Sequence, residues 1–473
     1  MKTTEQESVS SLRAAQRAEL RRRVAQAFAD ARSETGAFVP PGSSADAVAW
    51  RWVHEIVAKS RGAVSTHGTE VPDAFCEALT VQLKIALEDL AGALAKSLYE
   101  LRPDVHPERE TTTPTFTFVD LFAGIGGMRL GFERAGGRCV FSSEWDPAAQ
   151  VVYFNNHLEV PFGDITQIPP HFVPEHDVLV GGFPCQPFSH AGKKLGIADT
   201  RGTLFHSIAE IAEAAQPRFI FLENVRGLTA HDGGRTLYII LRRLQQVGYR
   251  LPVSKAAMSA AEAEDYKPLK KEAGTLIRYS KDFGVPQRRP RVFLVLSHET
   301  KTGVDPTTLY PEPRKSDQGL TVATILRTAE EQEFDPQNFI ISQRLLDGHT
   351  LRRAINKSAK KWGFGCNFVS PDAPYTATLS ARYYKDGAEI LIEMGPEKYR
   401  KLTPREASLL QGFPLGFELA KSKVQAYKQF GNSVTVPVVE AFASLIAESI
   451  TSSAERCVTD SEAAAINRRN DSA

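Results

Sequence analysis

The amino-acid sequence predicts an α/β protein: a doubly wound, mostly parallel, Rossmann-like sheet with a smaller second domain and an N-terminal helical extension. Three observations predict this class. Apolar runs of β type alternate with helical segments from residue 115 onwards, which is typical of a sheet covered by helices on both faces. Residues 300–399 lose this alternation. The first 113 residues show helical periodicity only, and 473 residues are enough for two or three domains.

Residues 1–113 are predicted to be a helical extension that ends in a linker. Between residues 73 and 101, leucines recur every three or four positions and form an amphipathic stripe. The stripe consists of Leu79, Leu83, Leu87, Leu90, Leu94 and Leu98. This pattern favours a small helical packing arm, and a partner-binding role is the alternative. The stretch RPDVHPERETTTPT (102–115) has the composition of a linker.

Five apolar runs predict the strands of the main domain, which we place at residues 114–299. They are TFTFVDLF, RCVFSSEW, HDVLVGGF, RFIFLENV and RVFLVLS. The irregular region 300–399 is predicted to form the second domain. Helical periodicity returns at 400–450, where the chain is expected to rejoin the main domain. The polar tail 451–473 is predicted to be disordered.

Composition narrows the class of protein. The net charge of +1 gives no overall basic signature, so any nucleic-acid binding must come from local patches. The five cysteines are scattered singly, which argues against a disulfide framework or a zinc site and favours a reducing compartment. No metal site is predicted. No apolar run reaches the ~18–20 residues of a membrane span, and the N-terminus lacks a signal-peptide core, so we expect a cytoplasmic protein.

The predicted strand ends carry the residues of interest, because open α/β sheets bind ligands beyond the carboxyl ends of their strands. Cys185 is one of them. It lies between Pro184 and Gln186 in a stiff loop after an apolar run, where a nucleophile would be placed, rather than inside the run as a core cysteine would. The other strand ends are DLFAGIGG (120–127), SEWD (143–146), GDIT (163–166) and LENV (222–225). We expect all of them to face one crevice.

The glycine loop and two acids suggest a nucleoside cofactor. The loop contains Gly124, Gly126 and Gly127 without the full spacing of a dinucleotide site, as expected for a cofactor that has no pyrophosphate. Glu144 occupies the position of an acid that binds a ribose diol. Trp145 is placed to stack on adenine, and Asp164 to accept from the adenine amino group. A tight turn, a surface salt bridge and a half-buried tryptophan are the alternative.

Five ordered motifs resemble those of the DNA cytosine-5 methyltransferase family. They are DLFAGIGG, FPCQPFS, ENV, FGVPQRRPRVF and QFGNSVTVPV, and they span roughly residues 115–450. The stretch SARYYKDGAEILI (380–392) further resembles the bacterial, Dcm-like branch that includes methylases of CCWGG sites. The resemblance implies a Rossmann-like methyltransferase fold, S-adenosyl-L-methionine as cofactor and duplex DNA as substrate. Residues 1–113 lie outside the shared motifs.

The resemblance implies covalent catalysis by Cys185, whose thiolate attacks carbon 6 of cytosine and makes carbon 5 nucleophilic. Glu223, if burial raises its pKa enough to keep it protonated, donates to ring nitrogen 3, and Asn224 helps to hold that loop. Arg289 and Arg291 alternate along an extended chain and are expected to act together at the flipped base, with Arg291 the better candidate for the cytosine carbonyl. An exposed arginine run on an edge strand is the alternative.

Further residues are assigned by the resemblance. On the cofactor side they are Phe122, Ile165, Asn432, Ser433 and Thr203. Gln186 and Ser189 belong to the loop that closes over DNA. Because a base inside a duplex must be flipped out before it can react, phosphate and base contacts are expected from the target-recognition region, 300–399. Its candidate contacts, some of which are simply a solvated face, are Arg352, Arg353, Lys357, Lys360, Lys361 and Arg382.

The sequence therefore predicts an S-adenosylmethionine-dependent DNA cytosine-5 methyltransferase of the restriction–modification type, acting as a monomer on DNA, with a possible cognate endonuclease. Two alternatives stay open. A tRNA cytosine methyltransferase on the same scaffold is opposed by the length of 300–399. A catalytically silent DNA-binding regulator is opposed by the intact Cys185 and Glu223. The N-terminal arm and an inserted surface loop or helix at 256–276 leave regulation open.

Overall fold

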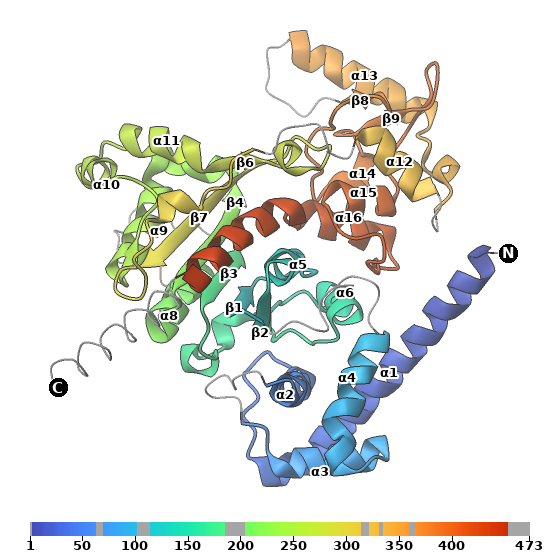
Figure 1. Ribbon diagram of the computed structural model, residues 1–473. Coiled ribbons are helices and arrows are strands. Elements are labelled where there is room, and N and C mark those ends of the chain that lie inside the picture. Colours follow the sequence, from blue (N-terminus) through green and yellow to red (C-terminus); the bar gives the residue numbers. More distant parts are fainter. Residues whose placement is uncertain are drawn as a thin grey trace, which may run out of the picture.

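The computed structural model describes residues 2–62, 70–101, 114–184, 204–313, 321–330, 334–358 and 366–452. Within these residues the chain forms three connected parts (Figure 1). A central sheet is flanked by helices, a smaller α/β part lies at one end, and the N-terminal helices pack beside the sheet.

The central sheet confirms the predicted fold class. In the described chain it has seven strands in the order β2-β1-β3-β4-β7-β5, and β6 pairs with β7. Strands β1 to β4 are parallel, whereas β5 and β6 run antiparallel to β7 and β7 runs antiparallel to β4. All five predicted apolar runs form strands. The bounds are β1 Phe116–Leu121, β2 Gly137–Ser143, β3 Val178–Gly182, β4 Phe219–Val225, β5 Tyr249–Arg250, β6 Ile277–Tyr279 and β7 Pro290–His298.

Side-chain alternation divides the core between the two faces of the sheet. In β4, Ile220 and Leu222 belong to one apolar cluster, and Phe219 and Phe221 belong to the cluster on the opposite face, because successive side chains of a strand point to opposite sides. The first face is covered by α8 and α9, and the second by α5 and the C-terminal helical segment (Figure 1). The helices run over α5 Gly127–Arg134, α6 Pro147–His157, α8 Leu204–Ala215 and α9 Arg235–Gln246.

Residues 434–450 of the C-terminal helical segment lie in the core of the main domain. Among the described residues, Lys423–Ser452 alone has the length and mean hydropathy of a membrane span, although 56% of its most apolar window is buried. Phe442 lies 4.8 Å from Phe293 and 5.3 Å from Phe221 between ring centroids. Packing against the sheet therefore accounts for its apolar composition, and residues 434–450 return to the main domain.

The smaller part is built on a short sheet of order β10-β9-β8. Its strands are β8 Phe368–Val369, β9 Leu391–Glu393 and β10 Tyr399–Arg400. The surrounding helices are α12 Val322–Glu330, α13 Gln343–Ser358, α14 Tyr383–Asp386, α15 Pro404–Leu410 and α16 Lys423–Asn432. Buried side chains of the smaller part, among them Leu379, Tyr383 and Phe430, form an apolar cluster that also includes Leu130 of α5 and Val152 of α6.

The N-terminal extension contains α1 Lys2–Thr35, α2 Ala45–Ser60, α3 Asp73–Leu83 and α4 Leu90–Leu101. The leucine stripe is not one helical face. The chain leaves α3 at Lys84, where φ is +57°, and resumes in η1 Leu87–Asp89 before α4. Leu79 and Leu94 are buried, whereas Leu87 is 58% exposed at the break between the helices.

The insertion at 256–276 is helical. It forms α10 Lys255–Glu262 and α11 Lys267–Ala273, followed by η5 Gly274–Leu276. Ser254 caps α10 by accepting from the Ala257 N–H, and Leu269 of α11 is fully buried. The insertion thus extends the core beside α9 rather than forming an unpacked loop.

Candidate active site

Strand register brings the predicted site residues to one edge of the sheet. Leu121 at the end of β1 pairs with Ser143 of β2 on one side and with Gly181 of β3 on the other. Gly182 of β3 in turn pairs with Glu223 of β4. The segments that follow β1, β2 and β3 therefore leave the sheet at the same level as Glu223, as the strand-end argument predicted.

The glycine loop after β1 turns sharply and leaves open space on one side. Phe122, Gly124 and Gly126 all have left-handed φ values, +59°, +58° and +87°. A Cβ on Gly126 would lie 2.1 Å from Nε2 of His157, so only glycine fits there, whereas a Cβ on Gly124 would meet no atom within 4 Å. A left-handed phenylalanine is strained, and such strain gathers at functional sites. The loop is therefore packed on one face and free on the other.

Glu144 connects the end of β2 to the glycine loop. Its carboxylate accepts from the Gly124 N–H at 2.8 Å and from the Asp146 N–H at 2.7 Å. Burial raises the pKa of Glu144, and these backbone hydrogen bonds oppose the rise. A carboxylate has about four lone-pair positions, so acceptor capacity for a ribose diol is left. Next to it, Trp145 is 77% exposed, so its ring is available for stacking.

The GDIT segment is held to the sheet by a short parallel bridge. Ser143 pairs with Phe162, and the strand ends there. Asp164 then caps η2 Ile165–Gln167 by accepting from the Thr166 N–H at 3.0 Å and from its hydroxyl at 2.8 Å. The side chain of Ile165, assigned to the cofactor by resemblance, is 4% exposed and packs in the apolar core beneath this turn. It therefore supports the segment from below.

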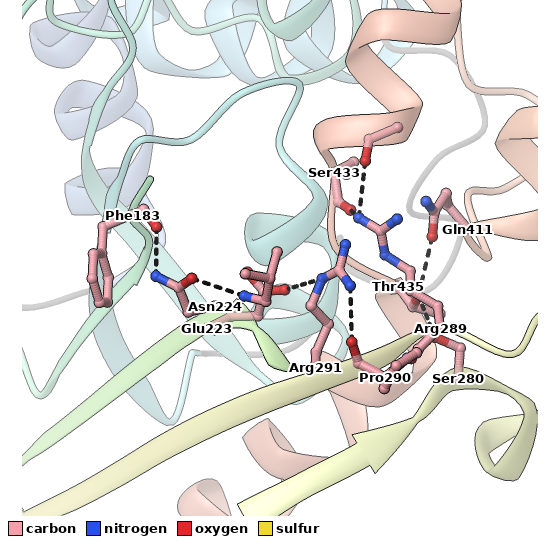
Figure 2. A network of polar contacts seen from close by, with 12 residues as sticks. Phe183, Glu223, Asn224, Ser280, Arg289, Pro290, Arg291, Gln411, Ser433 and Thr435 are labelled. Carbon is pink, nitrogen blue, oxygen red and sulfur yellow. Dashed lines mark hydrogen bonds and ion pairs between the residues drawn. The ribbon is translucent and has the colours of Figure 1, made fainter. Parts of the chain in front are cut away.

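Glu223 and Arg291 form an ion pair at the centre of the site (Figure 2). Oε1 of Glu223 lies 2.8 Å from Nε of Arg291. The pair exists because β4 and β7 are antiparallel with Val225 opposite Arg291, so the end of one strand meets the start of the other. Burial raises the pKa of Glu223, and the positive charges of Arg291 and Arg289 oppose that rise.

Asn224 ties the loop that carries Cys185 to strand β4. Its Nδ2 donates to the carbonyl of Phe183 at 2.8 Å, and its Oδ1 accepts from the Val225 N–H at 2.8 Å (Figure 2). Cys185, Gln186, Ser189 and Thr203 lie outside the described residues. The described part of the loop shows its root: Phe183 is buried and anchored beside Glu223, and Pro184 is exposed.

Arg289 has a different environment from Arg291. Its guanidinium donates to the carbonyls of Leu379 at 2.7 Å, Gly431 at 3.0 Å and Ser433 at 2.7 Å, and the residue is 1% exposed. Burial lowers the pKa of Arg289, and the charge of Arg291 lowers it further. Arg289 precedes β7, which begins at Pro290, and its charge still acts on both Glu223 and Arg291. The described contacts of Arg289 join the main domain to the smaller part.

Gln287 is a buried residue of the same motif to which the sequence analysis gave no role. Its Nε2 donates to the Leu410 carbonyl at 2.9 Å, and its Oε1 accepts from the Leu379 N–H at 2.8 Å. Its place directly before the arginines was the available signal. Gln287 and Arg289 both bind Leu379 and so fix one segment of the smaller part.

The FGNS segment lies between the glycine loop and the smaller part. A Cβ on Gly127 would lie 2.7 Å from Oγ of Ser433, and a Cβ on Gly431 would lie 2.3 Å from the amide nitrogen of Ala381. Asn432 between them is exposed. Ser433 is therefore brought to the glycine loop, as the cofactor assignment requires.

The described candidate DNA contacts Arg352, Arg353 and Arg382 are on the surface of the smaller part. Nη1 of Arg352 lies 3.3 Å from Oδ2 of Asp386, and the guanidinium of Arg353 lies 5.7 Å from the centre of the Phe368 ring. Both side chains stay exposed, and so does Arg382 at the start of α14. Lys357 is in α13, with its side chain outside the described set, and Lys360 and Lys361 lie outside the described residues. In the described part of the chain, no group of three or more metal-ligating side chains is assembled.

Comparison with known proteins agrees with this geometry. The C-5 cytosine-specific DNA methylase family matches residues 116–448. The chain is 42% identical over 362 residues to the type II methyltransferase M.SsoII of Shigella sonnei, covering 76% of this chain and 87% of that protein. It is 45% identical over 348 residues to M.NlaX of Neisseria lactamica, covering 72% and 100%.

The DNA-cytosine methyltransferase of Escherichia coli (strain K12) is 39% identical over 385 residues, covering 70% of this chain and 77% of that protein. The methyltransferase Dnmt2 of S. pombe shares the fold, with a TM-score of 0.53 and 22% identity over 70% of this chain and 98% of that chain. The assignment to the CCWGG branch stays a prediction, and helices α1 to α4 precede the family match. The chain belongs to the C-5 cytosine-specific DNA methylase family.

Proposed function

We propose that this enzyme methylates carbon 5 of cytosine in one short duplex DNA sequence, with the target base flipped out and bound covalently to Cys185. The observation that carries the proposal is the buried Glu223–Arg291 pair, at 2.8 Å, beside the anchored root of the Cys185 loop. When Cys185 attacks a cytosine, the ring presents nitrogen 3 and the neighbouring carbonyl oxygen. An acid such as Glu223 and a cation such as Arg291 are suited to bind these two groups.

The chemistry requires three actions of these residues. The Cys185 thiolate attacks carbon 6, and the electron pair of the 5,6 double bond becomes available at carbon 5. Glu223 in its protonated form donates to nitrogen 3, where charge develops, and its raised pKa favours that form. Arg291 binds the adjacent carbonyl oxygen. When carbon 5 takes the methyl group, the bond between that methyl and the sulfonium would break and leave a neutral thioether. A base, such as water, then takes the proton on carbon 5, the 5,6 double bond re-forms and Cys185 leaves as a thiolate.

The cofactor we propose is S-adenosyl-L-methionine, whose sulfonium supplies an activated methyl group. The chain fits it in three respects. The space beside Gly124 is open, Trp145 offers an exposed ring and Glu144 has acceptor capacity at the end of β2. Ser433 beside the glycine loop and Asp164 in the GDIT segment (163–166) complete the proposed pocket.

DNA contacts are proposed for region 300–399, which holds most of the smaller part and exposes Arg352, Arg353 and Arg382. We expect the enzyme to act as a monomer in the cytoplasm, where its DNA substrate is found. Its relatives M.SsoII and M.NlaX are named type II methyltransferases. By analogy, we propose that a restriction endonuclease of the same sequence specificity accompanies this enzyme.

Bisulfite sequencing of DNA from host cells that lack their own cytosine methylases tests the proposal. Cells expressing this chain should contain 5-methylcytosine at one recurring sequence, and cells expressing Cys185→Ser should not. Purified protein should transfer methyl groups to duplex DNA and not to tRNA. Methylated tRNA with unmodified DNA would support the tRNA enzyme instead. Sequence-specific DNA binding without any methyl transfer would support the silent regulator.

A further inference from the structure

The N-terminal extension contacts the main domain at the segment that carries Asp164. The connection from α1 to α2 contains a tight turn of sequence PPGS (40–43). In this turn the Ser43 N–H donates to the Pro40 carbonyl at 3.0 Å, and Gly42 has φ +74°. Proline followed by glycine at the two central positions is the pattern of a type II turn. This turn lies against residues 163 and 164.

The contact is close and specific. The Gly163 N–H donates to Oγ of Ser43 at 3.1 Å. A Cβ on Gly163 would lie 1.9 Å from the carbonyl oxygen of Gly42, so residue 163 must be glycine while the turn is in place. A Cβ on Gly42 would in turn lie 3.9 Å from the Cβ of Asp164. The turn therefore packs on the backbone of the segment and not only on its side chains.

Helix α2 fixes the position of the turn. Trp50 is fully buried, with its ring 5.1 Å from that of Phe154 in edge-on contact. Nε2 of His54 lies 2.7 Å from the Leu158 carbonyl. Phe154 is in the last turn of α6, and Leu158 is the residue that caps its C-terminus. Apolar side chains of α1, α2 and α4 belong to the same buried cluster as those of the sheet face. The extension is therefore part of the main-domain core.

Two backbone hydrogen bonds hold this segment to the sheet. The Glu144 N–H donates to the Phe162 carbonyl at 2.8 Å, and the Phe162 N–H donates to the Ser142 carbonyl at 2.9 Å. The next backbone donor, on buried Gly163, goes to Ser43 and not to the sheet. Because a buried N–H needs a partner, the path of the chain after Phe162 depends on Ser43.

We propose that Ser43 is a positioning residue of the cofactor site, through which the N-terminal extension sets the place of Asp164. This inference rests on the proposed role of Asp164 toward S-adenosylmethionine. The proposed contact should affect cofactor affinity rather than the chemical step. Asp164 follows β2, whereas Glu223 is in β4 and Cys185 follows β3 in the sequence.

Ser43→Ala tests the proposal in the full-length enzyme. The change leaves the Gly163 N–H without its acceptor, and lost hydrogen bonds of this kind predict a roughly three- to tenfold rise in KM and Kd for S-adenosylmethionine. The kcat at saturating cofactor should stay at the wild-type value. Ser43→Thr keeps the hydroxyl and should restore both constants. Ser60→Ala, which removes a hydroxyl that donates to the Val57 carbonyl at the far end of α2, is the matched control and should change neither.

The outcomes separate this inference from the proposed function. Wild-type protein that neither binds S-adenosylmethionine nor methylates DNA refutes the proposed function. An active wild type with an unchanged KM in Ser43→Ala overturns the inference alone, and so does an equal rise in Ser60→Ala. Should Ser43→Ala not fold, Phe38→Ala provides the second test. Phe38 is exposed, and the centre of its ring lies 5.7 Å from that of Phe172. Removing the ring therefore loosens the contact between the α1–α2 connection and the main domain. A fixed KM in a folded Phe38→Ala then overturns the inference.

Discussion

Glu223 and Arg291 are joined by an ion pair of 2.8 Å across two antiparallel strands, and both side chains are largely buried. Two opposing effects act on the pKa of Glu223. Burial favours the neutral acid, whereas the arginine favours the carboxylate, and the pKa of Glu223 is raised on balance. A raised pKa favours the protonated carboxyl group, which is the form that can donate a proton to a reacting base.

The nucleophile assignment predicts a trapped intermediate. With 5-fluorocytosine at the target position and S-adenosylmethionine present, the fluorine that replaces the carbon 5 proton cannot be abstracted, so Cys185 cannot be eliminated. A protein–DNA band should persist on a denaturing gel, and peptide mass should map the link to Cys185. Cys185→Ser should form no adduct and still bind the cofactor. An adduct at Cys139 or Cys366 would refute the assignment.

The acid assignment predicts a pH dependence. Only protonated Glu223 donates, so kcat should fall as pH rises through its raised pKa. Glu223→Gln, which keeps the size but has no transferable proton, should lower kcat about 10²- to 10⁴-fold, abolish this alkaline limb and leave cofactor affinity unchanged. Arg291→Ala removes the charge that lowers the pKa of Glu223, so the limb should move to higher pH. A limb that stays in place in Arg291→Ala would contradict this coupling.

The carbonyl contacts of Arg289 predict a structural defect on substitution. Arg289→Lys cannot reach Leu379, Gly431 and Ser433 together, and each buried carbonyl left without a donor costs about 1–3 kcal/mol. Urea unfolding should show a loss of that order. The control is Arg288→Lys. Arg288 lies over the Tyr279 ring, and a lysine at this position keeps a positive charge there. Equal stability of the two variants would show that the contacts of Arg289 contribute little.

The exposed ring of Trp145 predicts an effect on binding without an effect on folding. Trp145→Ala should weaken S-adenosylmethionine binding by roughly 1–3 kcal/mol, the range measured for lost base stacking. Because the side chain is 77% exposed, the free energy of unfolding should change little. Trp145→Phe, which keeps an aromatic face, should recover most of the affinity. Unchanged calorimetric affinity in Trp145→Ala would remove this residue from the pocket.

Local patterns predicted much of the fold and of the candidate site. The runs around Phe118, Phe141, Val180, Phe221 and Leu294 all became strands, because continuous apolar runs of this length bury both faces of a sheet. The acids at strand ends were found the same way, since a parallel strand delivers whatever follows it to one edge. The leucine stripe was misleading at Leu87, because periodicity does not show where a left-handed residue such as Lys84 ends a helix.

By itself, the sequence determined the class of sheet, the ordered motifs and the identity of the residues at the strand ends, because these depend on side-chain periodicity and on neighbours in the chain. Only the tertiary structure decided which of those residues meet. The antiparallel pairing of β4 with β7 placed Arg291 beside Glu223. At the junction with the smaller part, Arg289 donates to three backbone carbonyls. Docking of α2 brought Ser43 to Gly163. Each contact joins distant segments, and its energy comes from burial and register that no local pattern contains.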